Sequence, residues 1–195
     1  MSTPNFQKFF KTLLEIASNG KEYSTKEAKK ILISKMSLSE KDLKEKIKSG
    51  RQTKVDNRIQ WAKEYFVQAK IFSSPQRGVF KITDRGREFL SQGHDEITKK
   101  ELFQYPEFVK FSTPRKSEKN TIDKENVISE GYETPEEILQ NSYEDIRNSL
   151  ANELLNAIKN NSYEFFENLV VDLMLALGYG GSRSDAGKSI GKIGG

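Results

Sequence analysis

Hydrophobic residues recur every three or four positions near the start of the chain, which is the spacing of an amphipathic helix. The pattern predicts a first helix over about residues 6–17 that ends at Asn19-Gly20. Ser24 followed by Glu27 is a capping box and predicts the start of a second helix. The first of these helices has the apolar positions Phe6, Phe9, Phe10, Leu13, Leu14 and Ala17.

Two further helices are expected before residue 71. Ser37 and Glu40 predict another capping box ahead of a short helix over 38–48, which Ser49-Gly50 ends. A long helix is then expected from about Thr53 to Lys70. Its apolar stripe consists of Val55, Ile59, Ala62, Phe66 and Ala69.

The spacing of apolar residues then changes to that of strands. Ile71-Phe72 predicts a short strand, and 78–83 predicts a second one after a turn. Thr83 can cap a last helix over 84–90. Helices followed by a hairpin of this length predict a winged helix-turn-helix. The expected fold is therefore mainly α with a small β-hairpin.

The rest of the chain predicts a linker and two more helices. Residues 102–111 suggest a short helix or docking segment, and 112–131 are polar and aperiodic, as in a flexible linker. Thr134-Pro135-Glu136-Glu137 combines a capping box with proline at the first helical position. The helix it begins should end near Asn160. Three segments are expected: a winged-helix domain at 1–92, a docking segment and linker at 93–133, and C-terminal helices with a glycine-rich loop at 134–195.

The last predicted helix, capped by Ser162 and running over 163–177, is apolar on most faces. Such a helix is expected to be buried against other structure. A second copy of the chain, joined through the C-terminal helices in a homo-oligomer, is one expected partner.

Composition excludes several classes of protein. Hydrophobic residues are 35% and charged residues 31% of 195 positions, with no apolar run near the roughly 18 residues of a membrane helix. The first residues lack the pattern of a signal peptide, so a cytoplasmic protein without a membrane segment is expected. The absence of cysteine excludes disulfides, iron–sulfur clusters and cysteine zinc sites.

The charge is unevenly distributed. Residues 1–92 carry 20 Lys and Arg and 10 Asp and Glu, a net charge of +10. Residues 93–195 carry 12 and 18, a net charge of −6. A basic first half predicts a polyanionic partner, although lysine-rich solvated faces are also common in proteins that bind none.

Double-stranded DNA is the polyanion that a winged helix predicts, because the start of the second helix of a helix-turn-helix meets base edges. Arginine can pair with guanine there, and Asn or Gln with adenine. The alternative is a solvated helix end. The candidate residues at this end are Arg51, Gln52, Lys54, Asn57 and Arg58. Gln76 and Arg77 at the tip of the wing are candidates for phosphate contacts, although many winged helices contact only protein.

Glu167 is the candidate for metal chemistry, because it is an acidic residue on the apolar helix. A carboxylate can hold magnesium or orient water, but one carboxylate does not make a metal site, and a surface or salt-bridge role is equally possible. Asp185 in the glycine-rich loop has no partner acid near it in sequence.

Three stretches resemble the Mrr restriction-system family. They are GRQTKVDNRIQWAKEYFVQAKIFSSPQRGVFKITDRGREFL, the string YPEFVKF, and TPEEILQNSYEDIRNSLANELLNAIKNNSYEFFENLVVDLMLALGYGGS. The resemblance implies a winged helix that binds DNA, joined to a PD-(D/E)xK nuclease that cuts modified, typically methylated, DNA with magnesium. The C-terminal helices then open a truncated α/β restriction-endonuclease-like domain. Only Glu167 corresponds to the family's site, since the acidic strand motif and the lysine would follow Gly195. No cofactor is therefore expected to bind this chain, and the chain is expected not to cleave DNA.

Three functional hypotheses remain from the sequence. The chain is the specificity part of an Mrr-like restriction endonuclease, with cleavage belonging to the full-length form. Alternatively, it is a stand-alone winged-helix DNA-binding protein, such as a regulator, without hydrolysis. In the third hypothesis the winged helix contacts protein and the acidic C-terminal helices dimerise.

Overall fold

The structure is a computed structural model that describes residues 3–113 and 131–179. The described backbone is mostly helical and includes a three-stranded antiparallel sheet. This confirms the expected mainly α, winged-helix-like fold. The chain divides into two compact units, Met1–Gln140 and Asn141–Gly195.

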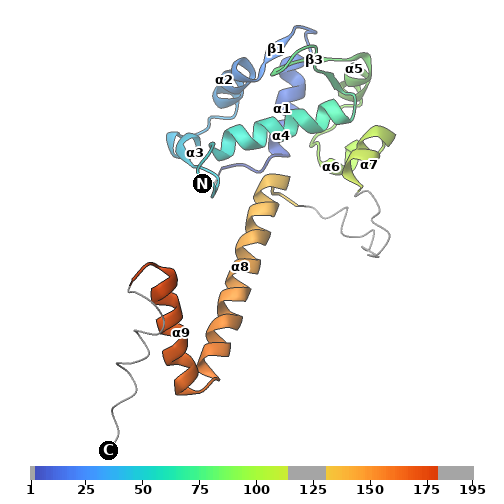
Figure 1. The fold of residues 1–195 in the computed structure, drawn as a ribbon. Helices are drawn as coiled ribbons and strands as arrows, with labels where there is room; N and C mark the ends of the chain where they lie inside the picture. The colour runs from blue at the N-terminus through green and yellow to red at the C-terminus, as the bar shows by residue number, and fades with distance from the viewer. Residues whose placement is uncertain (1–2, 114–130, 180–195) are drawn as a thin grey trace, which may run out of the picture. The chain divides into compact units, whose positions relative to one another are not determined.

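The elements follow the order expected for a winged helix with additional helices after it (Figure 1). In the first unit these are α1 (Lys8–Ala17), β1 (Tyr23–Ser24), α2 (Thr25–Lys35), α3 (Glu40–Lys44), α4 (Lys54–Gln68), β2 (Phe72–Ser73), β3 (Val79–Ile82), α5 (Asp84–Ser91), α6 (Lys99–Leu102) and α7 (Pro106–Ser112). The helix α8 (Pro135–Lys159) begins in the first unit and continues into the second, which also contains α9 (Tyr163–Ala176).

The sheet has the strand order β1-β3-β2. Phe72 of β2 pairs with Ile82 of β3, as expected for the wing hairpin. On the other edge of β3, Tyr23 of β1 pairs with Phe80. The two-residue β1 was not predicted, because it consists of one aromatic residue and Ser24, which the sequence marks as the N-cap of α2.

The core of the first unit is rich in phenylalanine, and α4 crosses its centre in Figure 1. The Phe66 ring of α4 lies 4.9 Å from that of Phe10 in α1 and 5.0 Å from that of Phe72 in β2, between ring centroids. These residues are almost fully buried. One aromatic side chain therefore joins the helical layer to the sheet.

The helix caps agree with the sequence at Ser24 and differ from it at Ser37. Ser24 and Glu27 form the predicted capping box of α2. The box predicted from Ser37 and Glu40 is wrong, because Ser39 and Asp42 cap α3 instead. Ser37 has a φ of +50° directly after α2 and so belongs to the end of that helix. The extended backbone of Ser39 is the conformation that an N-cap requires.

The helices α6 and α7 pack on the winged helix. Leu102 and Phe108 are fully buried in the same core cluster as α1 and α4. The Arg85 guanidinium of α5 donates to the Glu107 carboxylate over 3.1 and 3.2 Å and lies 5.0 Å above the ring of Tyr105. The docking segment expected from the sequence is thus part of the core, which extends past residue 92.

The wing and α5 approach each other closely at Gly86. Thr83 caps α5 by accepting a hydrogen bond from the Gly86 N–H. A Cβ atom on Gly86 would lie 2.4 Å from the Ile71 carbonyl oxygen and 2.6 Å from Cγ1 of Ile82. The Thr-x-x-Gly string therefore positions α5 against the sheet.

We predict that Gly86→Ala destabilises the first unit by roughly 1–3 kcal/mol, because backbone and core atoms would have to move to accept the methyl group. The urea midpoint of the full chain measures the effect. Glu88→Ala, at an exposed site on the same helix, is the control and should change stability by no more than about 0.5 kcal/mol. Equal midpoints for the two variants would contradict the packing argument.

Candidate nucleic-acid interface

The helix α4 occupies the position of the recognition helix. Thr53 caps it by accepting from the Asp56 N–H, and Thr53 also forms an isolated bridge with Lys46. Val55, Ile59, Ala62 and Phe66 face the core as the sequence predicts. The polar candidates at the start of α4 therefore lie on the other sides of the helix, where most have specific partners.

Lys54 is held by an acidic neighbour within the winged helix. Its Nζ lies 2.6 Å from Oε1 of Glu45, and the Thr3 hydroxyl donates to the other carboxylate oxygen. The hydrogen bonds from Lys54 and Thr3 lower the pKa of Glu45 to about 2, so the carboxylate is charged at neutral pH. The Lys54 ammonium is thus engaged, although its side chain is still 30% exposed.

Asn57 is buried beneath the first turn of α8 and is only 1% exposed. Its Nδ2 donates to Oε2 of Glu136 over 2.7 Å, and its Oδ1 accepts from the Thr134 hydroxyl over 2.6 Å. Gln52 donates to the same Glu136 oxygen over 3.0 Å. The amide of Asn57 therefore does not reach solvent.

Arg58 forms a shielded ion pair with the same turn of α8. Its Nη2 and Nε donate to Oε1 of Glu137 over 2.9 and 3.2 Å, and the two side chains are 11% and 10% exposed. Its Nη1 donates to the carbonyl oxygens of Thr3 and Pro4 over 2.6 and 2.8 Å. Arg58 thus links α4, the N-terminal segment and α8.

Three of the predicted DNA-contacting residues lie at exposed positions. Arg51 is in the turn before α4, and Gln76 and Arg77 are at the tip of the β2–β3 hairpin. No ion pair of Arg51 or Arg77 is found with any described residue. These two arginines can therefore approach a phosphate without first losing such a partner.

An open hollow of about 630 Å³ lies beside α4. Arg51, Gln52 and Gln60 line it together with Trp61, Glu64, Phe111 and Glu136. Trp61 also packs edge-on against Tyr65, 5.8 Å between ring centroids, which agrees with a packing role for this residue.

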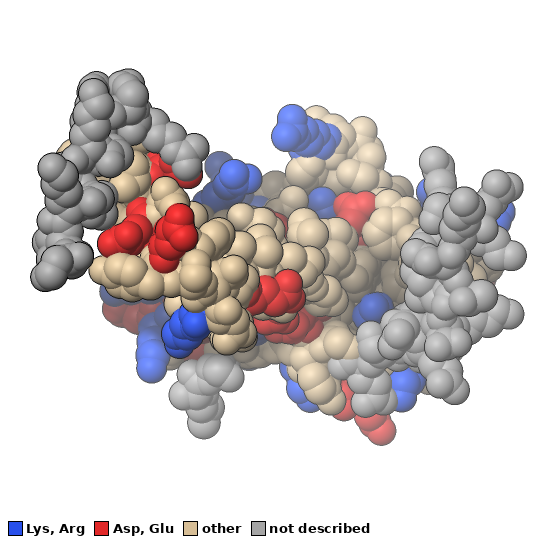
Figure 2. All heavy atoms as spheres, turned by 60° about the horizontal axis from the view of Figure 1, so that its bottom comes forward, with Lys and Arg blue, Asp and Glu red and all other residues tan. Residues whose placement is uncertain are grey.

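Charges of both signs are mixed on the face shown in Figure 2, where blue and red side chains are interspersed. Several cations of the basic first half pair with acids, among them Lys29 with Asp56 and Arg87 with Asp84. The net charge of +10 of residues 1–92 is therefore partly offset by ion pairs with neighbouring acids.

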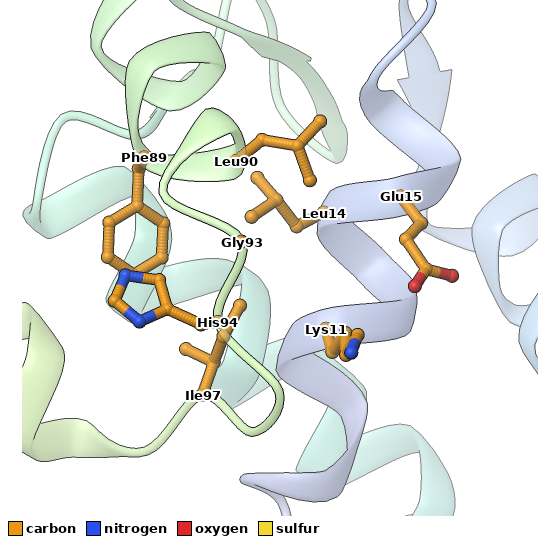
Figure 3. Close-up of a pocket in the computed structure, with 8 residues that line it drawn as sticks. All are labelled: Lys11, Leu14, Glu15, Phe89, Leu90, Gly93, His94 and Ile97. Carbon is orange, nitrogen blue, oxygen red and sulfur yellow. The ribbon is translucent and has the colours of Figure 1, made fainter.

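A smaller hollow of about 160 Å³ lies between α1 and the segment after α5 (Figure 3). Its lining is largely apolar, with Lys11 and Glu15 contributed by α1. His94 lies against the Phe89 ring, 4.8 Å between centroids, and contacts Gln92. These contacts make His94 a packing residue at the edge of this hollow.

Glu167 lies on α9 and is partly exposed. Among residues 3–113 and 131–179, no group of three or more His, Cys, Asp or Glu side chains could hold a metal ion. Asp185 and the glycine-rich loop lie outside the described residues. Within those residues, no helix combines the length and apolar character needed to cross a membrane.

The residues that sequence reasoning missed are the partners of the candidates. Thr134, Glu136 and Glu137 were recognised only as a helix start, and Thr134 and Glu137 do form the capping box, with bonds of 2.8 and 3.3 Å. Nothing in their spacing indicates that the same side chains also bind residues 77 to 84 positions earlier in the chain.

Comparison with known proteins gives two matches to one family. Residues 6–92 match the family model of the Mrr N-terminal domain. The chain is 24% identical over 192 residues to the type IV methyl-directed restriction enzyme EcoKMrr of Escherichia coli (strain K12). The alignment covers 95% of this chain and 62% of that relative. No solved structure matches significantly.

The family match covers the winged helix from the turn before α1 to the end of α5, which contains α4 and the wing. The similarity to EcoKMrr extends over most of the remaining chain. We conclude that residues 6–92 form an Mrr N-terminal domain, and the similarity to EcoKMrr over most of the chain supports a relationship to Mrr-type restriction proteins.

Proposed function

We propose that this chain is the DNA-binding part of an Mrr-type restriction protein. The observation that carries the proposal is the winged helix itself, with α4 in the recognition position and exposed arginines on the turn before it and on the wing. The family match covers the same residues. A basic domain of this type gains affinity for a duplex by releasing counterions from its phosphates.

The finer parts of the proposal concern specificity. We propose that Arg51, Gln52, Lys54, Asn57 and Arg58 read base edges and that Gln76 and Arg77 contact the backbone. Arg51 and the wing residues are exposed, whereas Asn57 and Arg58 require the start of α8 to move first. Recognition of modified duplex DNA is proposed because the similar E. coli protein is described as methyl-directed.

Cleavage is proposed for a full-length protein of this family, because the present chain spans 62% of its relative. The resemblance implies magnesium, with Glu167 as a ligand. The described residues do not fit that ion, because Glu167 has no cluster of acids around it. No catalytic step is therefore assigned to this chain.

The C-terminal helices expose a large apolar surface. None of the residues of α8 or α9 is buried. Leu139, Tyr143, Ile146, Phe166, Leu173 and Leu177 are each at least 47% exposed. Pairing of these helices in a homo-oligomer is part of the proposal, as is a cytoplasmic location.

We predict that the full chain binds duplex DNA with an affinity that falls steeply between about 50 and 200 mM salt, because bound cations displace counterions. Fluorescence anisotropy of a labelled duplex at several salt concentrations measures the slope. An affinity that does not change with salt, or no binding at the lowest salt, would rule out DNA binding of this kind.

A second prediction separates base reading from phosphate contact. Arg51→Ala should lower the affinity for a selected sequence by roughly 1–3 kcal/mol and relax the preference for it. Arg77→Ala should weaken binding to all duplexes alike and reduce the salt slope by about 1. Binding to preferred and scrambled duplexes distinguishes the two effects.

Arg147→Ala on α8 is the matched control for both variants, since it removes one arginine from the second unit. It should leave affinity and preference almost unchanged. If the three variants bind every duplex equally well, the exposed arginines of the winged helix do not form the interface.

A further inference from the structure

We propose that the acidic start of α8, Thr134 to Gln140, is an internal competitor of DNA that covers the base-reading side of α4. In this arrangement Gln52, Asn57 and Arg58 are bound by the chain itself, and they become available only when the segment leaves. The inference rests on the proposed DNA-binding function and adds a regulatory step to it.

The hydrogen bonds between α4 and the start of α8 occupy the base-reading groups of Gln52 and Asn57. Asn57 and Gln52 both donate to one carboxylate oxygen of Glu136, over 2.7 and 3.0 Å. Asn57 also accepts from Thr134, so the donor and acceptor that would read an adenine are both in use. The buried position of Asn57 leaves no path for a base edge while Thr134 is in place.

Arg58 forms an ion pair with Glu137 of the same segment. The guanidinium of Arg58 donates two hydrogen bonds to Glu137 through nitrogens with which arginine also binds phosphate or guanine. The side chains of the pair are about nine-tenths buried. The Glu137 carboxylate therefore binds Arg58 in the position that a DNA phosphate or a base acceptor would take.

The contact between α4 and the start of α8 can open without unfolding the domain. The core cluster of the first unit is built from residues between Phe6 and Phe108 and includes no described residue of α8. The α8 segment is held on α4 by polar contacts, and a further hydrogen bond of 3.0 Å runs from the Ser49 N–H to Gln140. Release would expose polar groups that water can solvate, while the phenylalanine core stays closed.

The helix α8 keeps its own cap when its first turn leaves α4. The Thr134 N–H donates to Oε2 of Glu137, and the Glu137 N–H donates to the Thr134 hydroxyl. These bonds lie within the segment and do not depend on α4. The start of α8 can thus exchange between a docked and a free helical state.

Neutralising the two docking carboxylates tests the proposal. Glu136→Gln with Glu137→Gln keeps the size of both side chains and removes the charge that holds Arg58. If the docked state makes up about nine-tenths of the molecules, it lowers the apparent affinity for DNA about tenfold. The double variant should therefore bind a duplex about tenfold more tightly than the control.

The control must remove the same charge elsewhere, because two fewer negative charges favour DNA binding by themselves. Asp145→Asn with Glu153→Gln does so on the part of α8 that lies in the second unit. Equal measurable affinities of the two double variants would overturn the internal competitor. Absence of binding by the wild type and both variants would overturn the proposed DNA-binding function and, with it, this inference.

Hydrogen exchange gives a second readout that a purely structural contact would not show. Saturating the wild-type chain with duplex DNA should speed exchange at the Ser49 amide and in the peptide covering 134–140, because both lose their docking partners. The amides of α1 should stay protected. Unchanged or slower exchange at Ser49 and 134–140 in the complex would mean that DNA binds with the segment still docked, which overturns the proposal.

Discussion

The packing of Phe66 is the interaction on which the rest of the first unit depends. Its ring contacts Phe10 of α1, Phe72 of β2 and Phe89 of α5, at 4.9, 5.0 and 6.5 Å between centroids. Because a buried aromatic ring contributes a large apolar area, these contacts fix the orientation of α4 relative to both α1 and the sheet. Once that orientation is fixed, the sides of α4 left for polar contacts are also determined.

The polar sides of α4 then have two kinds of neighbour. Within the winged helix, Glu45 holds Lys54 and Lys29 pairs with Asp56. From outside the Mrr N-terminal domain, Thr134, Glu136 and Glu137 bind Asn57, Gln52 and Arg58. A buried arginine–carboxylate pair contributes little net stability over an apolar pair, but breaking it from one side is costly. The Arg58–Glu137 pair therefore favours a specific contact between α4 and the start of α8, whose bonds break together.

Local features were predictable where a few adjacent residues decide them. The capping boxes at Ser24 and Thr134, the Thr53 and Ser162 caps and the apolar stripe of α4 each depend on neighbours within one or two helical turns. The incorrect prediction of a cap at Ser37 also has a local cause, because Ser37-x-x-Glu40 and Ser39-x-x-Asp42 both match the capping pattern. The end of α2 decided between them by placing Ser37 in a left-handed conformation.

The packing of α6 and α7 was only partly predictable. The aromatic residues of this segment indicated docking, but not that Phe108 would be fully buried or that Glu107 would bind Arg85. Burial of that kind depends on which surface α5 and α4 leave open. Such a surface is formed by residues far apart in the chain.

The sequence by itself determined the winged helix, its basic charge and the identity of the polar residues at the start of α4. Periodicity, caps and composition encode these features locally, and they do not depend on distant contacts. Only the tertiary structure decided the surroundings of those polar residues. Exposed Arg51 and Arg77 carry the same guanidinium group as Arg58 and differ from it in whether another segment covers the side chain. The covering segment begins at Thr134, 77 positions after Asn57. A hydrogen bond across such a separation leaves no periodic signal, because it is set by the folded path of the chain.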